Sequence, residues 1–94
     1  MPSVSCQVVV SNKLGLHARP AMQFVEAANR FKASVAVEKT GEEPMTVNGK
    51  SIMDMMTLAA VQGTNLIIRA DGQDAEDAVG QLAGLFNSKF GEEA

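Results

Sequence analysis

The order in which two hydrophobic periodicities follow each other constrains the fold of this chain more than any other feature of its sequence. Residues 4–10, 34–39, 45–47 and 66–70 have the apolar alternation and the β-branched residues of strands. Residues 18–30 and 75–86 repeat apolar residues at helical spacing, and Ser51 can cap a shorter helix that runs to about residue 62, just before Gly63. The sequence therefore predicts the element order βαββαβα.

This order also predicts how the elements pack. Helices between the first and second strands, and between the third and fourth, indicate a split βαβ arrangement, in which a later strand lies between two parallel ones. A chain of 94 residues buries only roughly 60–65% of the surface that it exposes when unfolded. We therefore expect one domain over residues 1–94, an α+β open-faced two-layer sandwich with three helices on one sheet face.

Composition excludes several classes of function. The apolar runs are far shorter than the roughly 20 residues that a membrane span needs, and the first residues lack the pattern of a signal peptide, so we expect a cytoplasmic protein and no membrane contact. Cys6 and His17, each the only residue of its type, cannot form an internal disulfide or a zinc cluster, and we expect no metal and no cofactor. A net charge of −3, with no Trp or Tyr, argues against nucleic acid as a partner.

The segment Gly15-Leu16-His17-Ala18-Arg19-Pro20-Ala21 places the histidine where a loop passes into a helix. Proline is tolerated in a first helical turn, so His17 is expected at or next to the N-cap. The first amide groups of a helix, here those of Ala18 and Arg19, lack internal partners and can bind an anion such as a phosphoryl group. The same positive helix end and Arg19 favour the neutral, nucleophilic imidazole. The alternative is that His17 is only a surface or capping residue.

The residues of the middle helix divide between core and surface. Met55 and Leu58 share the inward face, which leaves Ile52, Met53 and Met56 toward solvent. The simplest interpretation of Ser51 is that it is an ordinary N-cap. The carboxylate pairs 42–43 and 92–93 lie in a turn and a tail, and we expect them to be solvated charges.

Two strings resemble a known family. Leu14-Gly15-Leu16-His17-Ala18-Arg19-Pro20-Ala21 is similar to the active-site signature of HPr, the histidine-containing phosphocarrier of the bacterial phosphoenolpyruvate-dependent phosphotransferase system, and Asn48-Gly49-Lys50-Ser51-Ile52-Met53 resembles its regulatory-serine segment. The resemblance implies an antiparallel four-stranded sheet of order 1-4-2-3 and a monomeric carrier. It also implies that His17 accepts phosphate on Nδ1 from phosphorylated enzyme I, with Arg19 assisting, and hands it to a IIA-type protein.

The same resemblance implies roles for further residues. Ser51 would be phosphorylated by HPr kinase/phosphorylase, although Asp54 stands where the family pattern has a glycine. Enzyme I and IIA-type proteins would dock on an apolar rim beside His17, formed by Leu16, Met22, Ile52, Met53 and Met56. Residues 12–15 and 85–90 are more similar to the nitrogen-regulatory branch, NPr, than to the sugar branch.

Two other functions remain open. The chain could be mainly a regulatory binding module whose contacts depend on Ser51, with phosphate relay secondary. It could also be a hydrolase or mutase that uses His17, but that segment lacks a second general acid or base.

Overall fold

The computed structural model describes residues 3–92 and contains one four-stranded sheet in that range. Its strands are β1 (Ser3–Val9), β2 (Ser34–Lys39), β3 (Met45–Asn48) and β4 (Asn65–Asp71), and they lie in the order β1-β4-β2-β3. Every neighbouring pair is antiparallel, so β4 lies between β1 and β2, which run parallel to each other. The sheet order that the family resemblance implied is confirmed, as is the split βαβ arrangement.

The strand register explains why one sheet face is apolar. Cys6 of β1 lies opposite Ile68 of β4, which in turn lies opposite Val37 of β2. Side chains at alternate positions of a strand point to the same face, so this row and its neighbours two residues away face the core together. Val37 and Ile68 are fully buried, whereas Arg69 on the opposite face is exposed. The predicted alternation is confirmed.

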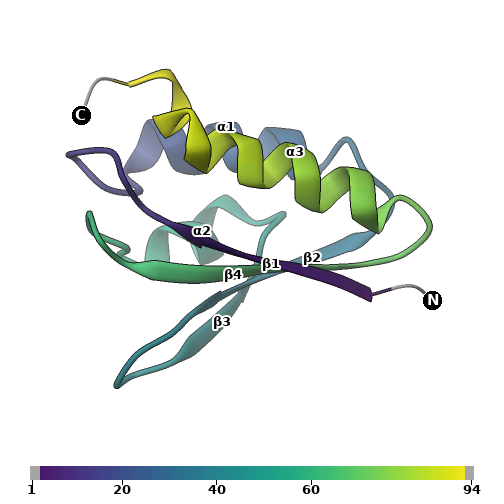
Figure 1. The fold of residues 1–94 in the computed structure, drawn as a ribbon, viewed down its shortest axis with the longest axis horizontal. Coiled ribbons are helices and arrows are strands. Elements are labelled where there is room, and N and C mark those ends of the chain that lie inside the picture. The colour runs from purple at the N-terminus through teal and green to yellow at the C-terminus, as the bar shows by residue number, and fades with distance from the viewer. Residues whose placement is uncertain (1–2, 93–94) are drawn as a thin grey trace.

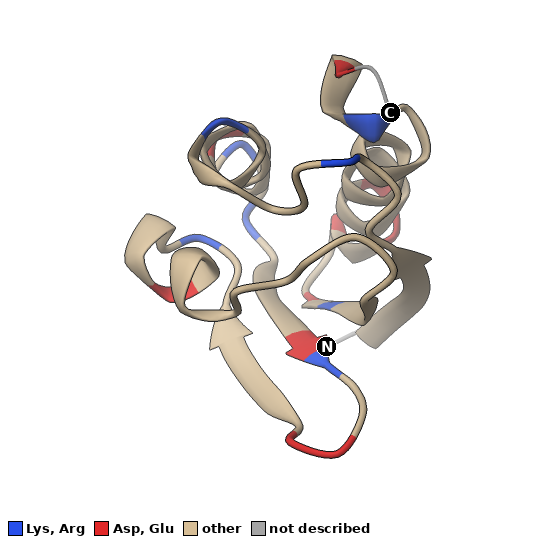
Figure 2. Ribbon diagram, turned by 90° about the vertical axis from the view of Figure 1, so that its left-hand side faces the viewer, with Lys and Arg blue, Asp and Glu red and all other residues tan. Residues whose placement is uncertain are grey.

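Helices cover only that apolar face of the sheet (Figure 1). They are α1 (Ala18–Ala28), α2 (Ile52–Thr57) and α3 (Ala75–Asn87), and a short 3₁₀ turn, η1 (Lys89–Gly91), follows α3. The end view in Figure 2 shows the helices on one side and the strands on the other. The structure over residues 3–92 is therefore the predicted open-faced sandwich, with the other sheet face toward solvent.

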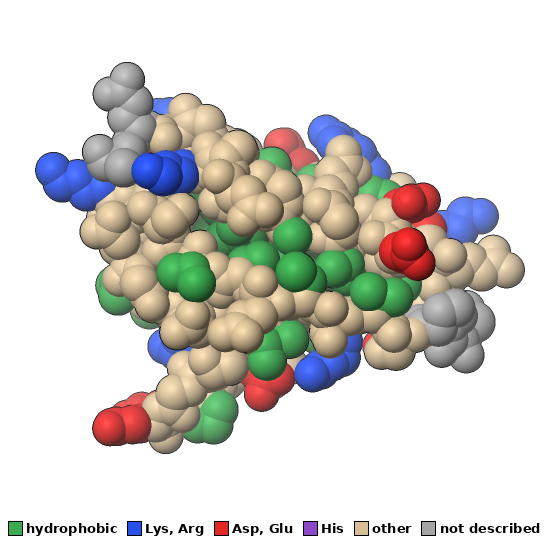
Figure 3. All heavy atoms as spheres, in the orientation of Figure 1, with side chains coloured by type: hydrophobic (Ala, Val, Ile, Leu, Met, Phe, Trp, Pro, Cys, Tyr) green, Lys and Arg blue, Asp and Glu red, His purple; other side chains and the backbone are tan. Residues whose placement is uncertain are grey.

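The core lies between the two layers. Phe24 of α1 and Phe86 of α3 meet edge to face with ring centroids 5.9 Å apart, and Phe90 of η1 meets Phe86 in the same way at 4.8 Å. Such aromatic pairs stabilise a core beyond the area that they bury. On the face shown in Figure 3, the visible apolar side chains gather along the seam between α3 and β1, and charged side chains lie around the margin of the view. The predicted inward faces of α1 and α3 are confirmed, because these residues are buried: Ala21, Phe24, Ala28, Ala75, Ala78, Val79, Leu82 and Phe86.

Helix α2 is shorter than the sequence predicts. It ends at Thr57 with Leu58 as its C-cap, and Ala59 adopts a left-handed φ of 48°, whereas the prediction continued the helix to about residue 62. The Ala60 carbonyl oxygen accepts a hydrogen bond from the Leu16 amide (2.8 Å), and Gly63 and Thr64 exchange hydrogen bonds with Val10. The left-handed Ala59 ends the helix, and the bonds to the loop after β1 hold the segment that follows it.

Other element boundaries shift by one or two residues. α1 ends at Ala28 where the prediction extended to residue 30, and β1 spans Ser3–Val9 where residues 4–10 were predicted. Such shifts are usual at the ends of elements. Within residues 3–92, the structure has no helix long and apolar enough to cross a membrane.

Candidate functional site

The site forms around His17, which is the N-cap of α1 as predicted. Its backbone is extended (φ −78°, ψ −169°), and its carbonyl oxygen accepts the Ala21 amide at 3.0 Å. The imidazole forms no capping hydrogen bond with the helix and is 34% exposed. The ring is therefore accessible from outside and is free to react without loss of the cap.

Two backbone donors lie directly after this histidine. Within the described part of the chain, the amide groups of Ala18 and Arg19 form no hydrogen bond to the protein, and Pro20 has no amide hydrogen to donate. The first turn of α1 carries no acidic residue that would compete with an anion. Arg19 is exposed and forms no ion pair with residues 3–92. Free amides, the helix dipole and a guanidinium are groups that favour the binding of an anion.

The loop before His17 is held in one position by close packing. Gly15 has a left-handed φ of 72°, and a Cβ on it would lie 2.7 Å from the Ala60 carbonyl oxygen. A side chain at this position would therefore be strained and would also clash with backbone. The buried Asn12 donates from Nδ2 to the Gly15 carbonyl oxygen at 2.6 Å. These contacts determine where the histidine lies relative to the segment after α2.

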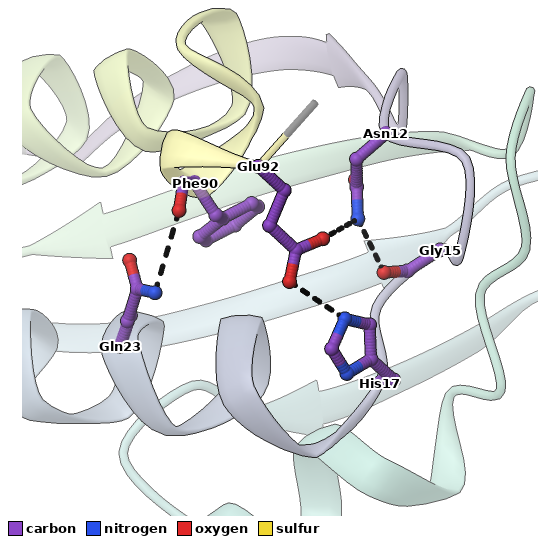
Figure 4. A network of polar contacts seen from close by, with 6 residues as sticks. All are labelled: Asn12, Gly15, His17, Gln23, Phe90 and Glu92. Carbon is purple, nitrogen blue, oxygen red and sulfur yellow. Dashed lines mark hydrogen bonds and ion pairs between the residues drawn. The ribbon is translucent and has the colours of Figure 1, made fainter. Parts of the chain in front are cut away.

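Glu92 is part of the site, and the sequence analysis missed it. Its Oε2 lies 2.7 Å from His17 Nε2, its Oε1 accepts from Asn12 Nδ2 at 3.0 Å, and its side chain is only 13% exposed (Figure 4). The expectation that the pair 92–93 is solvated is thus wrong for Glu92, and residue 93 lies outside the described residues. Left-handed backbone at residues 89–91 turns the chain back toward α1, and buried Phe90 anchors that turn. The contact joins residues 75 positions apart, so no local sequence pattern indicates it.

The residues expected to form an apolar rim divide into two groups. Met22 on α1 and Ile52, Met53 and Met56 on α2 are exposed, Met53 to 77%. The expectation for Leu16 is wrong, because its side chain is 4% exposed and packs in the core. The Leu16 amide donates a hydrogen bond to the Ala60 carbonyl oxygen, which holds this part of the loop against the segment after α2. The three exposed α2 residues line a shallow apolar hollow together with Thr57.

Inside α2, the predicted division between core and surface is confirmed. Met55 and Leu58 are fully buried, while Met53 and Met56 face solvent. Ser51 is the N-cap of this helix, and its Oγ accepts from the Asp54 amide at 3.2 Å. The Asp54 carboxylate in turn accepts from the Asn48 amide at 3.0 Å. Ser51 thus caps the helix, and the Asp54 side chain ties the helix start to the end of β3.

Comparison with known proteins assigns the family. The family model described as "PTS HPr component phosphorylation site" matches residues 4–88. The chain belongs to the HPr family. His17, Arg19 and Ser51 lie inside the matched range, whereas Glu92 lies beyond it. The family resemblance seen in the sequence is confirmed, and the protein is an HPr phosphocarrier of the phosphotransferase system.

Relatives match over most of this HPr chain. The phosphocarrier protein HPr of Xylella fastidiosa is 41% identical over 87 residues, which are 93% of this chain and 94% of that protein. The HPr-like protein Crh of Bacillus subtilis is 46% identical over 80 residues, 85% of this chain and 91% of that protein. The crystal structure of HPr-C-His from Thermoanaerobacter tengcongensis superposes with a TM-score of 0.84, at 41% identity and over 100% of both chains.

Proposed function

We propose that His17 is the residue of this phosphocarrier that receives the phosphoryl group, on Nδ1, from phosphorylated enzyme I and passes it to a IIA-type protein. The observation that carries the proposal is the partly exposed imidazole at the α1 N-cap, directly before two amides without partners and the exposed Arg19. All these groups come from one chain, so a monomer contains a complete site.

The chemistry is an exchange of one nitrogen–phosphorus bond for another. The Nδ1 lone pair attacks the phosphorus while the bond to the donor's nitrogen breaks in line, and the donor nitrogen keeps the bonding electrons. The Ala18 and Arg19 amides and the Arg19 guanidinium stabilise charge on the equatorial oxygens. Only these few donors surround the group, so it is stabilised in transfer without being trapped in the resting phosphoprotein.

Removal of the imidazole tests this proposal. Incubation with phosphoenolpyruvate and enzyme I is expected to add one acid-labile phosphoryl group to the protein, and His17→Ala is expected to add none. Intact mass and ³¹P NMR measure the product. Arg19→Ala should still be loaded, but at an initial rate lower by about tenfold or more, because one stabilising donor is lost. A His17→Ala protein that still gains the acid-labile group would overturn the assignment.

Partner docking is proposed on the exposed apolar surface formed by Met22, Ile52, Met53 and Met56, which we call the methionine surface. Leu16, being buried, is not part of it. Unbranched thioether side chains adapt to differently shaped partners, which suits a carrier that must bind enzyme I and a IIA-type protein in turn. The surface lies on α1 and α2, which pack against each other.

Ser51 supports a second candidate function, a regulatory binding module controlled by phosphorylation. A phosphate at a helix N-cap is favoured by the dipole and by the first amides, and this residue adjoins the methionine surface. One relative is described as the Bacillus subtilis catabolite repression HPr. Asp54 argues against strong phosphorylation by HPr kinase/phosphorylase. Its carboxylate would repel a phosphate on Ser51, and its amide already donates a hydrogen bond to the Ser51 hydroxyl. Phosphate relay through His17 therefore remains the first candidate.

The nitrogen-regulatory branch is proposed on the sequence of residues 12–15 and 85–90. The test is the acceptor: phosphorylated protein should lose its phosphoryl group faster to a nitrogen-regulatory IIA-type protein than to a sugar-specific one. The opposite preference would assign the chain to the sugar branch.

A further inference from the structure

We propose that Glu92 is a positioning residue for phosphoryl transfer: its carboxylate keeps the proton of the neutral His17 ring on Nε2 and so leaves the Nδ1 lone pair free to react. The inference rests on the proposed function, because it gives a role to a contact of the same histidine. The inference goes beyond the proposed function because Glu92 lies outside the range that the family model matches.

The carboxylate is held firmly in place. Oε2 lies 2.7 Å from His17 Nε2, and Oε1 accepts from Nδ2 of Asn12, a side chain that is only 1% exposed. On the other side, Phe90 packs against Phe86, and its carbonyl oxygen accepts from Gln23 Nε2 at 3.4 Å (Figure 4). Contacts from α1 and from the loop before α1 thus fix the position of Glu92. A side chain that orients another side chain has to be fixed in this way.

The chemical consequence follows from the donors and acceptors present. An ionised carboxylate only accepts hydrogen bonds, so the 2.7 Å contact requires Nε2 to carry the hydrogen. A neutral imidazole has one N–H and one lone pair, and the lone pair must then be on Nδ1. Figure 4 shows Nδ1 turned away from Glu92 and toward the first turn of α1. The reactive nitrogen is therefore on the side of the ring away from the carboxylate.

The same contact assists the transfer itself. When Nδ1 forms its bond to phosphorus, the hydrogen stays on Nε2 and the ring acquires positive charge. The carboxylate at Nε2 stabilises that charge, as the buried carboxylate of a Ser-His-Asp triad does for its imidazolium. Because the carboxylate contacts the far side of the ring, it does not occupy the position where the phosphoryl group binds.

The first experiment measures the ring directly, without any phosphorylation. Long-range ¹H–¹⁵N spectra at about pH 9, where imidazole side chains are neutral, report which nitrogen carries the hydrogen. We expect the Nε2–H form to dominate in the unaltered protein and the Nδ1–H form to increase in Glu92→Ala. In Glu92→Gln the Nε2–H form should fall between these two, because the single amide oxygen can accept from His17 Nε2–H or from Asn12 Nδ2 but cannot replace both carboxylate oxygens. Glu42→Ala, which removes an exposed carboxylate in the β2–β3 turn, should match the unaltered protein.

The second experiment measures initial rates of loading by enzyme I with the same proteins. Loss of an orienting group typically costs tenfold or more in activity, so Glu92→Ala should load about tenfold more slowly, Glu92→Gln at an intermediate rate, and Glu42→Ala normally. Thermal unfolding of Glu42→Ala should match that of the unaltered protein, and Glu92→Ala should unfold at a lower temperature but stay folded at the assay temperature, because Asn12 Nδ2 loses one acceptor. An unchanged ring spectrum in Glu92→Ala, or a changed spectrum with an unchanged loading rate, overturns the inference. Loading of His17→Ala would instead overturn the proposed function, so the two failures are distinguishable.

Discussion

Asp74 shows at the scale of one residue how this fold binds a distant loop. It is the N-cap of α3, but its side chain forms no capping bond with that helix. The carboxylate oxygens accept from the Lys32 and Ala33 amides, each at 2.8 Å, in the loop between α1 and β2. The bond from the Lys32 amide is the main reason why the pKa of Asp74 lies below its usual value of 3.8. The sequence predicts that a helix begins after Asp74, but it does not predict the hydrogen bonds between Asp74 and the loop after α1.

This lowered pKa makes a prediction about stability. A carboxyl whose pKa is lower in the folded than in the unfolded protein stabilises the fold above the unfolded value, and the contribution is lost as the pH falls through the folded value. Asp74→Asn should therefore lower the free energy of unfolding at pH 7, and the difference should be smaller at pH 3, which lies below the unfolded value of 3.8. Urea unfolding at both pH values measures it. Asp77→Asn, one turn further along α3, is the matched control, and an equal Asp74→Asn deficit at both pH values would contradict the account.

At the scale of the element, α3 contains two glycines that its packing does not require. A Cβ added at Gly80 or Gly84 would meet no atom within 4 Å, so close approach of a neighbour does not explain either of them. Both are exposed and lie in a regular helix. In such positions glycine only increases the conformational entropy lost on folding.

We therefore expect Gly80→Ala and Gly84→Ala each to raise the free energy of unfolding by about 0.5–1 kcal/mol. Gly63→Ala is the control, since a Cβ there also meets open space but φ is +93°, and alanine should destabilise the protein. Urea or thermal unfolding measures all three. If Gly63→Ala stabilised the protein, or if the two α3 variants destabilised it, backbone conformation would not explain how these substitutions change the free energy of unfolding.

At the scale of the whole molecule, tertiary packing brings together the two helices that carry the methionine surface. Met22 belongs to α1, while Ile52, Met53 and Met56 belong to α2, and the two helices pack together although β2 and β3 separate them in the chain. Ser51 begins α2 at the same surface. A charge placed anywhere on this surface has to lose its hydration when a partner docks.

Met53→Glu and Ser51→Asp are thus expected to weaken binding to enzyme I about tenfold or more, with little change in thermal stability. Titration calorimetry and chemical-shift mapping measure the binding and its location. Met45→Glu makes the same exchange at an exposed methionine of β3 and should bind normally. Normal binding by Met53→Glu, or shifts that leave α2 unaffected, would place the docking surface elsewhere.

The sequence by itself determined the element order, the buried faces of strands and helices, and the position of His17 at the N-cap of α1. These features depend on periodicity, caps and proline, which act over a few residues, and for that reason local patterns predicted them. Resemblance to the HPr family supplied the sheet order as well.

Only the tertiary structure decided where α2 ends, that Leu16 is buried, and that Glu92 contacts His17. Each of these depends on a bond or a packing contact between segments far apart in the chain: Ala60 with Leu16, or the turn after α3 with the loop before α1. A residue's own neighbours in sequence carry no signal of such a partner. The chemical environment of the histidine is therefore set by contacts that exist only once the chain has folded.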